Sequence, residues 1–75
     1  MDAKALKAKL IIIGLNVPEL LARLKNRGVC MSRSAFYRKL NGKSEFYRNE
    51  MIAIADELKV DQTEFIAIFF SKKVS

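Results

Sequence analysis

Residues 32–43 read SRSAFYRKLNGK, and this stretch decides which fold the rest of the chain can form. Ser32 is a good helix N-cap, and Phe36 and Leu40 follow four residues apart, on one side of a helix. Asn41-Gly42 is expected to end this helix, because both residues tolerate a positive φ. The stretch therefore predicts a short helix with one apolar face and one strongly basic face.

The sequence before this stretch has helical periodicity with clear start and stop signals. Asp2 can cap a first helix, and Gly14 stands where a left-handed terminal residue is wanted. Asn16-Val-Pro-Glu19 combines a capping box with a proline in the first turn, so it opens a second helix. That helix is expected to stop at Gly28, and Val29-Cys30-Met31 is expected to form an extended connector.

Two further helices are predicted after the stretch. One places Met51, Ile52, Ala55 and Leu58 on a buried stripe, and Asp61-Gln-Thr-Glu64 is a second capping box that opens the last helix. The chain is therefore expected to be one all-α domain of five helices over residues 1–75, with Ser71 to Ser75 frayed. Ile13 is assigned to the buried stripe of the first helix. The predicted core consists of Leu6, Leu10, Leu21, Leu24, Phe36, Leu40, Met51, Ile54, Ala55, Leu58 and Phe65.

Positive charge is concentrated around the same stretch. The 75 residues carry a formal net charge of +6, yet residues 23–48 alone hold eight basic side chains against one acid, Glu45, a net charge of +7. A local cationic field attracts a polyanion, since each Lys or Arg that meets a phosphate releases condensed counterions. The eight basic residues are Arg23, Lys25, Arg27, Arg33, Arg38, Lys39, Lys43 and Arg48.

The composition argues against several classes of protein. There is no histidine, which removes the usual general base and the commonest metal ligand, so we expect no enzyme, no metal and no cofactor. The single cysteine, Cys30, suits a reducing cytosol and is expected to be a buried small hydrophobe rather than a reactive thiol. No apolar run approaches the length of a membrane span, and no secretory signal is recognised, so a cytoplasmic protein is expected.

The basic face of the short helix has the side chains that read DNA. Arg33, Ser34, Tyr37 and Arg38 lie on adjacent edges of one face, opposite Phe36 and Leu40. An α-helix fits the major groove, where Arg can bond guanine twice and hydroxyl groups can reach bases or phosphates. The alternative interpretation is that these charges simply form the solvated side of the helix.

The turn after this helix is expected to contact the DNA backbone. Asn41-Gly42-Lys43 could present backbone N–H groups and an ammonium to phosphates. Lys39, at one side of the basic face, is also expected to contact phosphate. These residues would position the helix, whereas the exposed face would supply specificity.

The residues described so far resemble the lambda-repressor-like (Cro-type, XRE) helix-turn-helix family of phage and bacterial regulators. Glu19-Leu-Leu-Ala22 and Ser32 to Lys43 resemble the two helices of its motif, and Glu50 to Leu58 resembles the helix that follows. The chain is most similar to small Cro-like regulators of prophages of Gram-positive bacteria, which carry a similar run and a phenylalanine-rich C-terminus. The resemblance covers residues 4–70 and implies a regulator in the cytoplasm of a bacterial host.

The resemblance also implies roles for individual residues. It assigns base reading to Arg33, Ser34, Tyr37 and Arg38. Pro18 stands where the family often has a glutamine on the DNA backbone, so Asn16 or the Val17 N–H would substitute for it. The interval from Ala22 to Ser32 is longer than in the usual motif, which leaves the crossing angle of the two helices open. The phosphate-binding residues would be Asn16, Ser32, Lys39, Asn41 and Lys43.

Two classes of function fit these features. The first is a sequence-specific double-stranded DNA-binding transcriptional regulator that binds an operator as a homodimer, since one small module seldom buries enough surface for tight specific binding. The second is a protein-interaction module, such as an antirepressor that binds a cognate repressor protein. Nonspecific nucleic-acid binding is a weaker third possibility. The first is favoured because the charge lies on the recognition segment, where an antirepressor has no need of it.

The last helix has more large apolar residues than one face can bury. Phe65, Ile66, Ile68, Phe69 and Phe70 fall within six positions, whereas a helix turns only about 100° of its surface toward a core. The surplus, taken as Ile68, Phe69 or Phe70, is expected to form an exposed dimerisation patch. The alternative is that these side chains fold back over a thin core.

Overall fold

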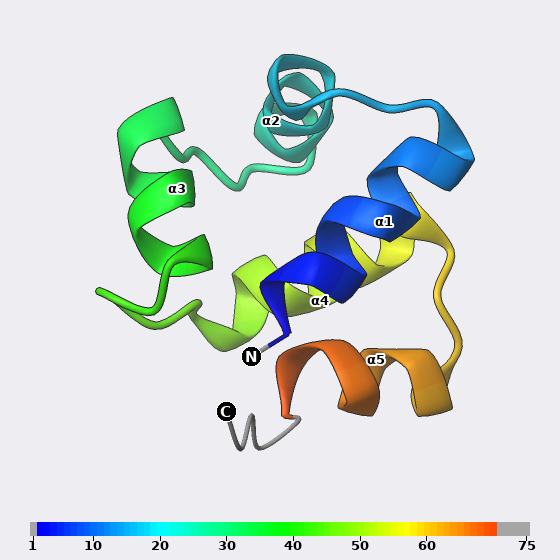
Figure 1. Ribbon diagram of the computed structural model, residues 1–75. Helices are drawn as coiled ribbons and strands as arrows, with labels where there is room; N and C mark the ends of the chain where they lie inside the picture. Colours follow the sequence, from blue (N-terminus) through cyan, green and yellow to red (C-terminus); the bar gives the residue numbers. More distant parts are fainter. Residues whose placement is uncertain (1, 71–75) are drawn as a thin grey trace.

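The computed structural model describes residues 2–70, which form five α-helices and, within that range, no β-strand (Figure 1). This confirms the predicted all-α, five-helix fold. The predicted fraying of residues 71–75 lies outside the described residues. None of the helices described is long and apolar enough to cross a membrane. The helices are α1 (Ala3–Ile13), α2 (Val17–Asn26), α3 (Arg33–Leu40), α4 (Arg48–Leu58) and α5 (Gln62–Phe69).

The helices surround one core, and α3 lies at its edge. α1 packs against α4 and α5, whereas α2 packs against α4 and α3. Figure 1 shows α3 on the left, separated along the chain from α2 by an extended connector. Two contacts join α1 to α5: the Asp2 N–H donates to the Ile68 carbonyl at 2.7 Å, and Lys9 Nζ lies 3.0 Å from Glu64 Oε2. α3 therefore has one side on the core and the other toward solvent.

Local capping interactions start and end the helices as predicted. Asp2 Oδ1 accepts from the Ala5 N–H at 3.0 Å, and Ser32 Oγ accepts from the Ala35 N–H at 3.1 Å. The two capping boxes, Asn16 with Glu19 and Asp61 with Glu64, are both formed. Gly14 adopts a left-handed conformation with φ of +79°, which ends α1 and which other residues rarely adopt.

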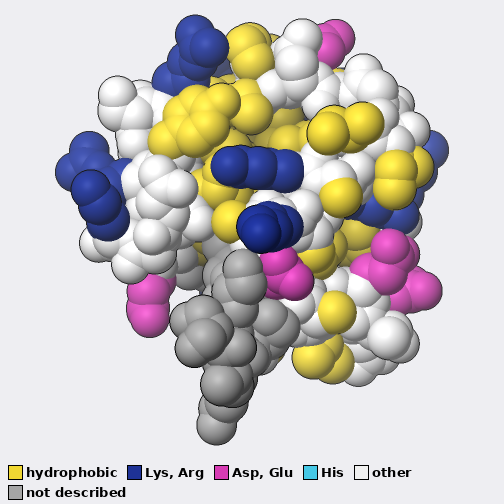
Figure 2. Space-filling model, viewed as in Figure 1, with side chains coloured by type: hydrophobic (Ala, Val, Ile, Leu, Met, Phe, Trp, Pro, Cys, Tyr) yellow, Lys and Arg dark blue, Asp and Glu magenta, His cyan; other side chains and the backbone are white. Residues whose placement is uncertain are grey.

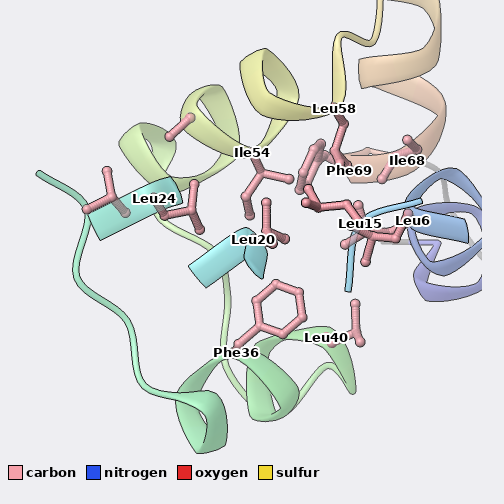
Figure 3. Close-up of a cluster of buried hydrophobic side chains, with 13 residues drawn as sticks. Leu6, Leu15, Leu20, Leu24, Phe36, Leu40, Ile54, Leu58, Ile68 and Phe69 are labelled. Carbon is pink, nitrogen blue, oxygen red and sulfur yellow. The ribbon is translucent and has the colours of Figure 1, made fainter. Parts of the chain in front are cut away.

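The core is built from all five helices and from two residues of the connecting segments, Leu15 and Val29 (Figure 3). Seven predicted core residues are buried: Leu6, Leu10, Leu24, Phe36, Leu40, Ile54 and Leu58. The other four are only half-buried at its margin. The full set of buried apolar residues is Leu6, Leu10, Leu15, Leu20, Leu24, Val29, Phe36, Leu40, Ala53, Ile54, Leu58, Ile68 and Phe69.

Two predictions of buried residues, one in α1 and one in α4, were wrong because the helix turns a neighbouring residue toward the core. Ile13 and Ile52 are exposed, while Ala53 and Ile54 face the core in α4. In an amphipathic helix with apolar residues on more than one face, the sequence leaves the buried face ambiguous, and packing against neighbouring helices selects it. Cys30 is exposed, so the prediction of a buried small hydrophobe is wrong: its neighbours Val29 and Met31 pack against the core, and Cys30 between them points outward.

The C-terminal helix corrects a further prediction. Ile68 and Phe69 are buried, so they do not form an exposed patch. Phe69 packs edge-on against Phe46, from the loop before α4, with ring centroids 5.9 Å apart. Phe70 remains 58% exposed and Ile66 is exposed beside it on the same helix end. The dense apolar run is therefore divided between the core and the surface.

Replacing Phe36 or Leu24 with alanine is expected to lower the free energy of unfolding by about 2–5 kcal/mol, because each is fully buried and would leave a cavity. Chemical denaturation followed by circular dichroism measures this change. The control is Ile12→Ala in exposed α1 surface, which is expected to cost only a few tenths of a kcal/mol. Equal losses in the core and control variants would contradict the described packing.

Candidate nucleic-acid interface

The solvent face of α3 carries all four residues predicted to read bases. Arg33, Ser34, Tyr37 and Arg38 are exposed, while Phe36 and Leu40 are buried on the opposite side. In Figure 2, Lys and Arg side chains project at the left edge of the molecule, where α3 lies in Figure 1. The structure thus brings the four residues together on one accessible helix face.

Tyr37 lies between the core and this face. Its ring packs edge-on against Phe36, with centroids 5.8 Å apart and ring planes at 78°, and the residue is 39% exposed. An aromatic side chain held in this way loses little further conformational freedom when its hydroxyl makes a hydrogen bond. Tyr37 can therefore offer a fixed hydroxyl group at the surface of α3.

The turn after α3 keeps its side chains free but not its backbone N–H groups. The N–H groups of Asn41, Gly42 and Lys43 donate to carbonyls of Tyr37, Lys39 and Arg38 at 2.9, 3.2 and 2.9 Å. The prediction that these N–H groups face phosphate is therefore wrong, because they satisfy the open carbonyls at the end of α3. Gly42, with φ of +82°, allows this closure. The Asn41 and Lys43 side chains remain exposed.

Lys39 does not belong to the exposed basic face. Its Nζ lies 2.7 and 2.8 Å from the two carboxylate oxygens of Glu50 in α4, and its side chain is only 11% exposed. The ammonium also lies 4.1 Å from the centroid of the Tyr47 ring. The predicted phosphate contact of Lys39 is corrected to an inward ion pair, since its charge is already neutralised and covered.

Glu50 is the one charged residue buried in the described part of the chain. Besides Lys39, its Oε1 accepts the Tyr47 N–H at 2.8 Å, which satisfies a free donor at the start of α4. A carboxylate in this first turn also interacts favourably with the helix dipole. Glu50 therefore holds the C-terminal part of α3 and the N-terminal end of α4 in one hydrogen-bonded cluster.

Arg23 of α2 and Arg27, the C-cap of that helix, both form ion pairs with acidic residues of α4. Arg27 Nη1 lies 3.2 Å from Asp56 Oδ2 and Arg27 Nε donates to Glu57, while Arg23 Nη1 lies 3.6 Å from Glu57 Oε1. The hydrogen bond to Glu57 raises the pKa of Arg27, and the same bond lowers the pKa of Glu57 below its ordinary value. These charges clamp α2 to α4, and they leave the candidate interface with fewer free cations than the sequence suggests.

The eight basic residues of 23–48 therefore fall into two groups. Arg23, Arg27 and Lys39 pair with carboxylates of α4. The other five make no ion pair with any residue that the structure describes, and all five are exposed. We call them the free cations: Lys25, Arg33, Arg38, Lys43 and Arg48.

Two of the predicted phosphate-binding residues act as helix caps. Asn16 Oδ1 accepts the Glu19 N–H at 2.9 Å and Ser32 Oγ accepts the Ala35 N–H at 3.1 Å. Both residues are exposed at the start of their helices. The Asn16 amide group and the Ser32 hydroxyl proton are still available to an acceptor in solvent, so capping does not exclude the predicted role.

The ion pairs with α4 were missed from the sequence. Arg23 and Arg27 are four residues apart and so share one side of α2, and the adjacent Asp56-Glu57 could have signalled a complementary site. Lys39 and Glu50 are eleven residues apart, with a turn and a loop between them. The spacing within α3 could have indicated the inward position, because Lys39 is three residues after the buried Phe36 whereas Arg38 is only two after it, but the partner Glu50 could not be found from local spacing.

No family model matches this chain, and neither the curated proteins nor the solved structures contain a match. Among the described residues, no group of three or more Cys, Asp or Glu side chains is placed to hold a metal ion. The candidate site is therefore defined by its own geometry, a short helix with an exposed basic face.

Glu50→Gln is expected to lower the free energy of unfolding by about 3 kcal/mol or more, because it leaves the sheltered Lys39 ammonium without a counter-charge. Lys39→Met combined with Glu50→Leu is expected to recover most of this loss. The control, Arg23→Ala, removes a half-exposed arginine and leaves Glu57 paired with Arg27, so it should cost less than about 1 kcal/mol. Urea titrations of the three variants and the unmodified protein test this; a double variant as unstable as Glu50→Gln would contradict the role of the pair.

Proposed function

We propose that the protein is a sequence-specific double-stranded DNA-binding transcriptional regulator of the Cro or repressor type. It inserts α3 into the major groove of an operator. Supporting this, the cations of α2 and α3 are divided between two uses. Arg23, Arg27 and Lys39 hold the fold together, whereas Arg33, Arg38 and Lys43 keep free charge on α3 and its turn.

The dimensions of α3 suit a major groove. An α-helix with its side chains is about 10–12 Å across, which matches the groove width of about 12 Å, and the eight residues of α3 give about 12 Å of helix to present to the base edges. Ser34 and Arg38 are four residues apart on the exposed face, and Arg33 and Tyr37 form a parallel row. A helix presented in this way can address several successive base edges, with Arg33 or Arg38 bonding guanine twice.

The charge of Arg33 is unfavourable for α3 by itself. Arg33 occupies the first position of α3, at the positive end of the helix dipole, and no acidic residue follows in the first turn. Sequences usually place acids there, so a cation at this point weakens the local helix signal. A residue that opposes local stability is expected where a ligand requires it, and here the ligand would supply negative charge.

Phosphate contacts would position α3 in the groove. Lys43 and Asn41, in the exposed turn after α3, and Ser32 and Asn16, at the starts of α3 and α2, are exposed on the elements that would face the DNA backbone. Lys43 would contribute a counterion-releasing contact that all sequences share. The side chains of α3 would then contribute the difference between one sequence and another.

We further propose that two copies bind one operator through an α4–α5 apolar surface made of Met51, Ile52, Phe65 and Phe70. Ile52 and Phe70 are exposed, and the four residues together with Arg48 line a hollow of about 420 Å³, so that a twofold contact would have to keep the two Arg48 side chains at its solvent-exposed margin. A twofold contact here would place two α3 helices on successive turns of DNA, roughly 34 Å apart. Of the three residues expected from the sequence to form a dimerisation patch, Ile68, Phe69 and Phe70, only Phe70 is exposed and belongs to this surface.

The resemblance to the lambda-repressor-like family agrees with this proposal, with α2 and α3 as its helix-turn-helix. The positions to which the resemblance assigns base reading, Arg33, Ser34, Tyr37 and Arg38, are exposed on α3. A regulator of this kind would work in the cytoplasm of a bacterial host, on phage or prophage operators. Neither a cofactor nor a metal is part of the proposed mechanism.

Arg33→Ala and Arg38→Ala are each expected to lose about 1–3 kcal/mol of specific binding and to relax base preference at one position. Lys43→Ala should weaken all duplexes about equally and lower the salt slope by about one. The measurement is fluorescence anisotropy with a duplex selected from a random pool, and with its scrambled counterpart.

The matched control is Arg27→Ala, which removes an arginine that two carboxylates already hold. It should leave affinity for the selected duplex unchanged under conditions where the variant is folded. Equal affinity of the unmodified protein for selected and scrambled duplexes would reduce the function to nonspecific binding. Uniform weakening by alanine at positions 33 and 38 would make these residues phosphate contacts.

Phe70→Asp is expected to leave the monomer folded and to abolish cooperative binding to a two-site operator, because a carboxylate cannot be buried in an apolar dimer contact. Titration of one-site and two-site duplexes measures cooperativity, and a thermal melt checks folding. Ile12→Asp, at an exposed position of α1, is the control and should keep cooperativity. Unchanged cooperativity in Phe70→Asp would remove the dimer contact from this surface.

A further inference from the structure

Three consecutive isoleucines at the end of α1 have no role in the core. Ile11 and Ile12 are 79% and 77% exposed, more than any other large apolar residue described, and Ile13 is exposed as well. Consecutive residues of a helix point about 100° apart, so the three side chains face different directions, and of the three it is Ile11 that lines a hollow of the surface. Ile11 lies on a different helix from the α4–α5 apolar surface, so the proposed dimer contact does not account for its exposure.

Ile11 also forms one wall of a groove that reaches α3. The groove has a volume of about 500 Å³ and lies between α1, the start of α2 and α3. Figure 2 shows hydrophobic side chains gathered in this region, between α3 on the left and α1 on the right, with Lys or Arg side chains among them. Its apolar lining is Leu10, Ile11, Leu15, Val17, Pro18, Phe36, Tyr37 and Leu40.

The charged groups of this groove are all of one sign. Lys7 and Arg33 are its only ionisable lining residues apart from the Tyr37 phenol, no acidic residue lines it, and α1 contains no Asp or Glu. A second copy of the same face would bring the same cations and be repelled. The polar groups of the lining, Lys7, Asn16, Arg33 and the Tyr37 hydroxyl, lie among a larger number of apolar residues, so a phosphate alone would leave most of the lining uncovered. Charge and polarity together favour an acidic occupant with an apolar face.

We propose that this groove, which we call the α1–α3 groove, binds an acidic amphipathic helix of a partner protein. The apolar stripe of such a helix would cover Ile11 and the groove floor, and its flanking carboxylates would face Lys7 and Arg33. Recognition of an amphipathic helix in an apolar groove is a recurrent mode of peptide binding. Because Arg33 and Tyr37 also belong to the solvent face of α3, the bound helix would compete with DNA.

The first experiment tests the groove without DNA. The probe is a synthetic amphipathic helix of about 18 residues, five turns long, with leucine on one stripe and glutamate on both flanks. The control peptide has lysine in place of each glutamate. Amide chemical shifts of the isotopically labelled protein report where each peptide binds. The acidic peptide is expected to shift residues 7–18 and 33–40, and to bind at least about tenfold more tightly than the lysine peptide.

Matched variants separate the groove from the second apolar surface. Ile11→Gln is expected to weaken the acidic peptide about tenfold, as loss of one apolar anchor does, whereas Ile52→Gln on α4 should have no effect. Both positions are exposed, so both variants should keep the thermal midpoint of the unmodified protein. Equal binding of the two peptides, no binding of either, or shifts confined to α4 and α5 would each overturn the proposal.

The second experiment tests competition, and it alone rests on the proposed function. The acidic peptide should displace the selected duplex from the protein, and Ile11→Gln should bind that duplex normally but resist displacement. If the protein binds no duplex at all, the proposed function fails while the peptide result stands. Simultaneous binding of peptide and duplex would overturn the competition. If Ile11→Gln instead loses DNA affinity and the peptide never binds, the groove belongs to the nucleic acid and the proposal is wrong.

Discussion

The position of α3 depends on the ion pair between Lys39 and Glu50. An isolated helix of eight residues is unstable in water, so α3 exists only because the rest of the chain holds it. Phe36 and Leu40 supply the apolar contact that turns one face of α3 inward. The charged pair adds a polar contact to α4 on that inner side, and the same carboxylate accepts the Tyr47 N–H at the start of α4. The face that α3 turns to solvent therefore follows from the apolar and ionic contacts on its inner side.

α4 organises the cations of the molecule. Asp56 and Glu57 near its end hold α2 through Arg23 and Arg27, while Glu50 near its start holds α3. α4 therefore carries acidic side chains near both of its ends, and these fix the positions of the more basic helices α2 and α3. The excess positive charge of residues 23–48 is thus partly structural, and only the remainder can serve a ligand. A net charge read from sequence overstates what is available for binding.

Features that depend on near neighbours could be predicted from the sequence. Helix caps, stop signals and the inward pair of α3 arise from interactions within four residues, and they were correct. Ile52 was placed inward and Ile68 outward, because both faces of α4 and α5 carry apolar residues and distant helices choose between them. The inward position of Lys39 was also missed, because its partner Glu50 is eleven residues away in the sequence. At the candidate site, the four outward residues of α3 could be predicted from the sequence. The backbone N–H groups of residues 41–43 could not, because they bond to the last carbonyl groups of α3 and are not available to a phosphate.

The free cations have a consequence for the folded state itself. Lys25, Arg33, Arg38, Lys43 and Arg48 repel one another in the absence of a ligand, and Arg33 also opposes the dipole of its helix. An anion that settles among them removes this repulsion and binds the native chain in preference to the unfolded one. Ligand binding and conformational stability are thereby linked through one set of charges. A bound anion would therefore raise the thermal midpoint of this small domain.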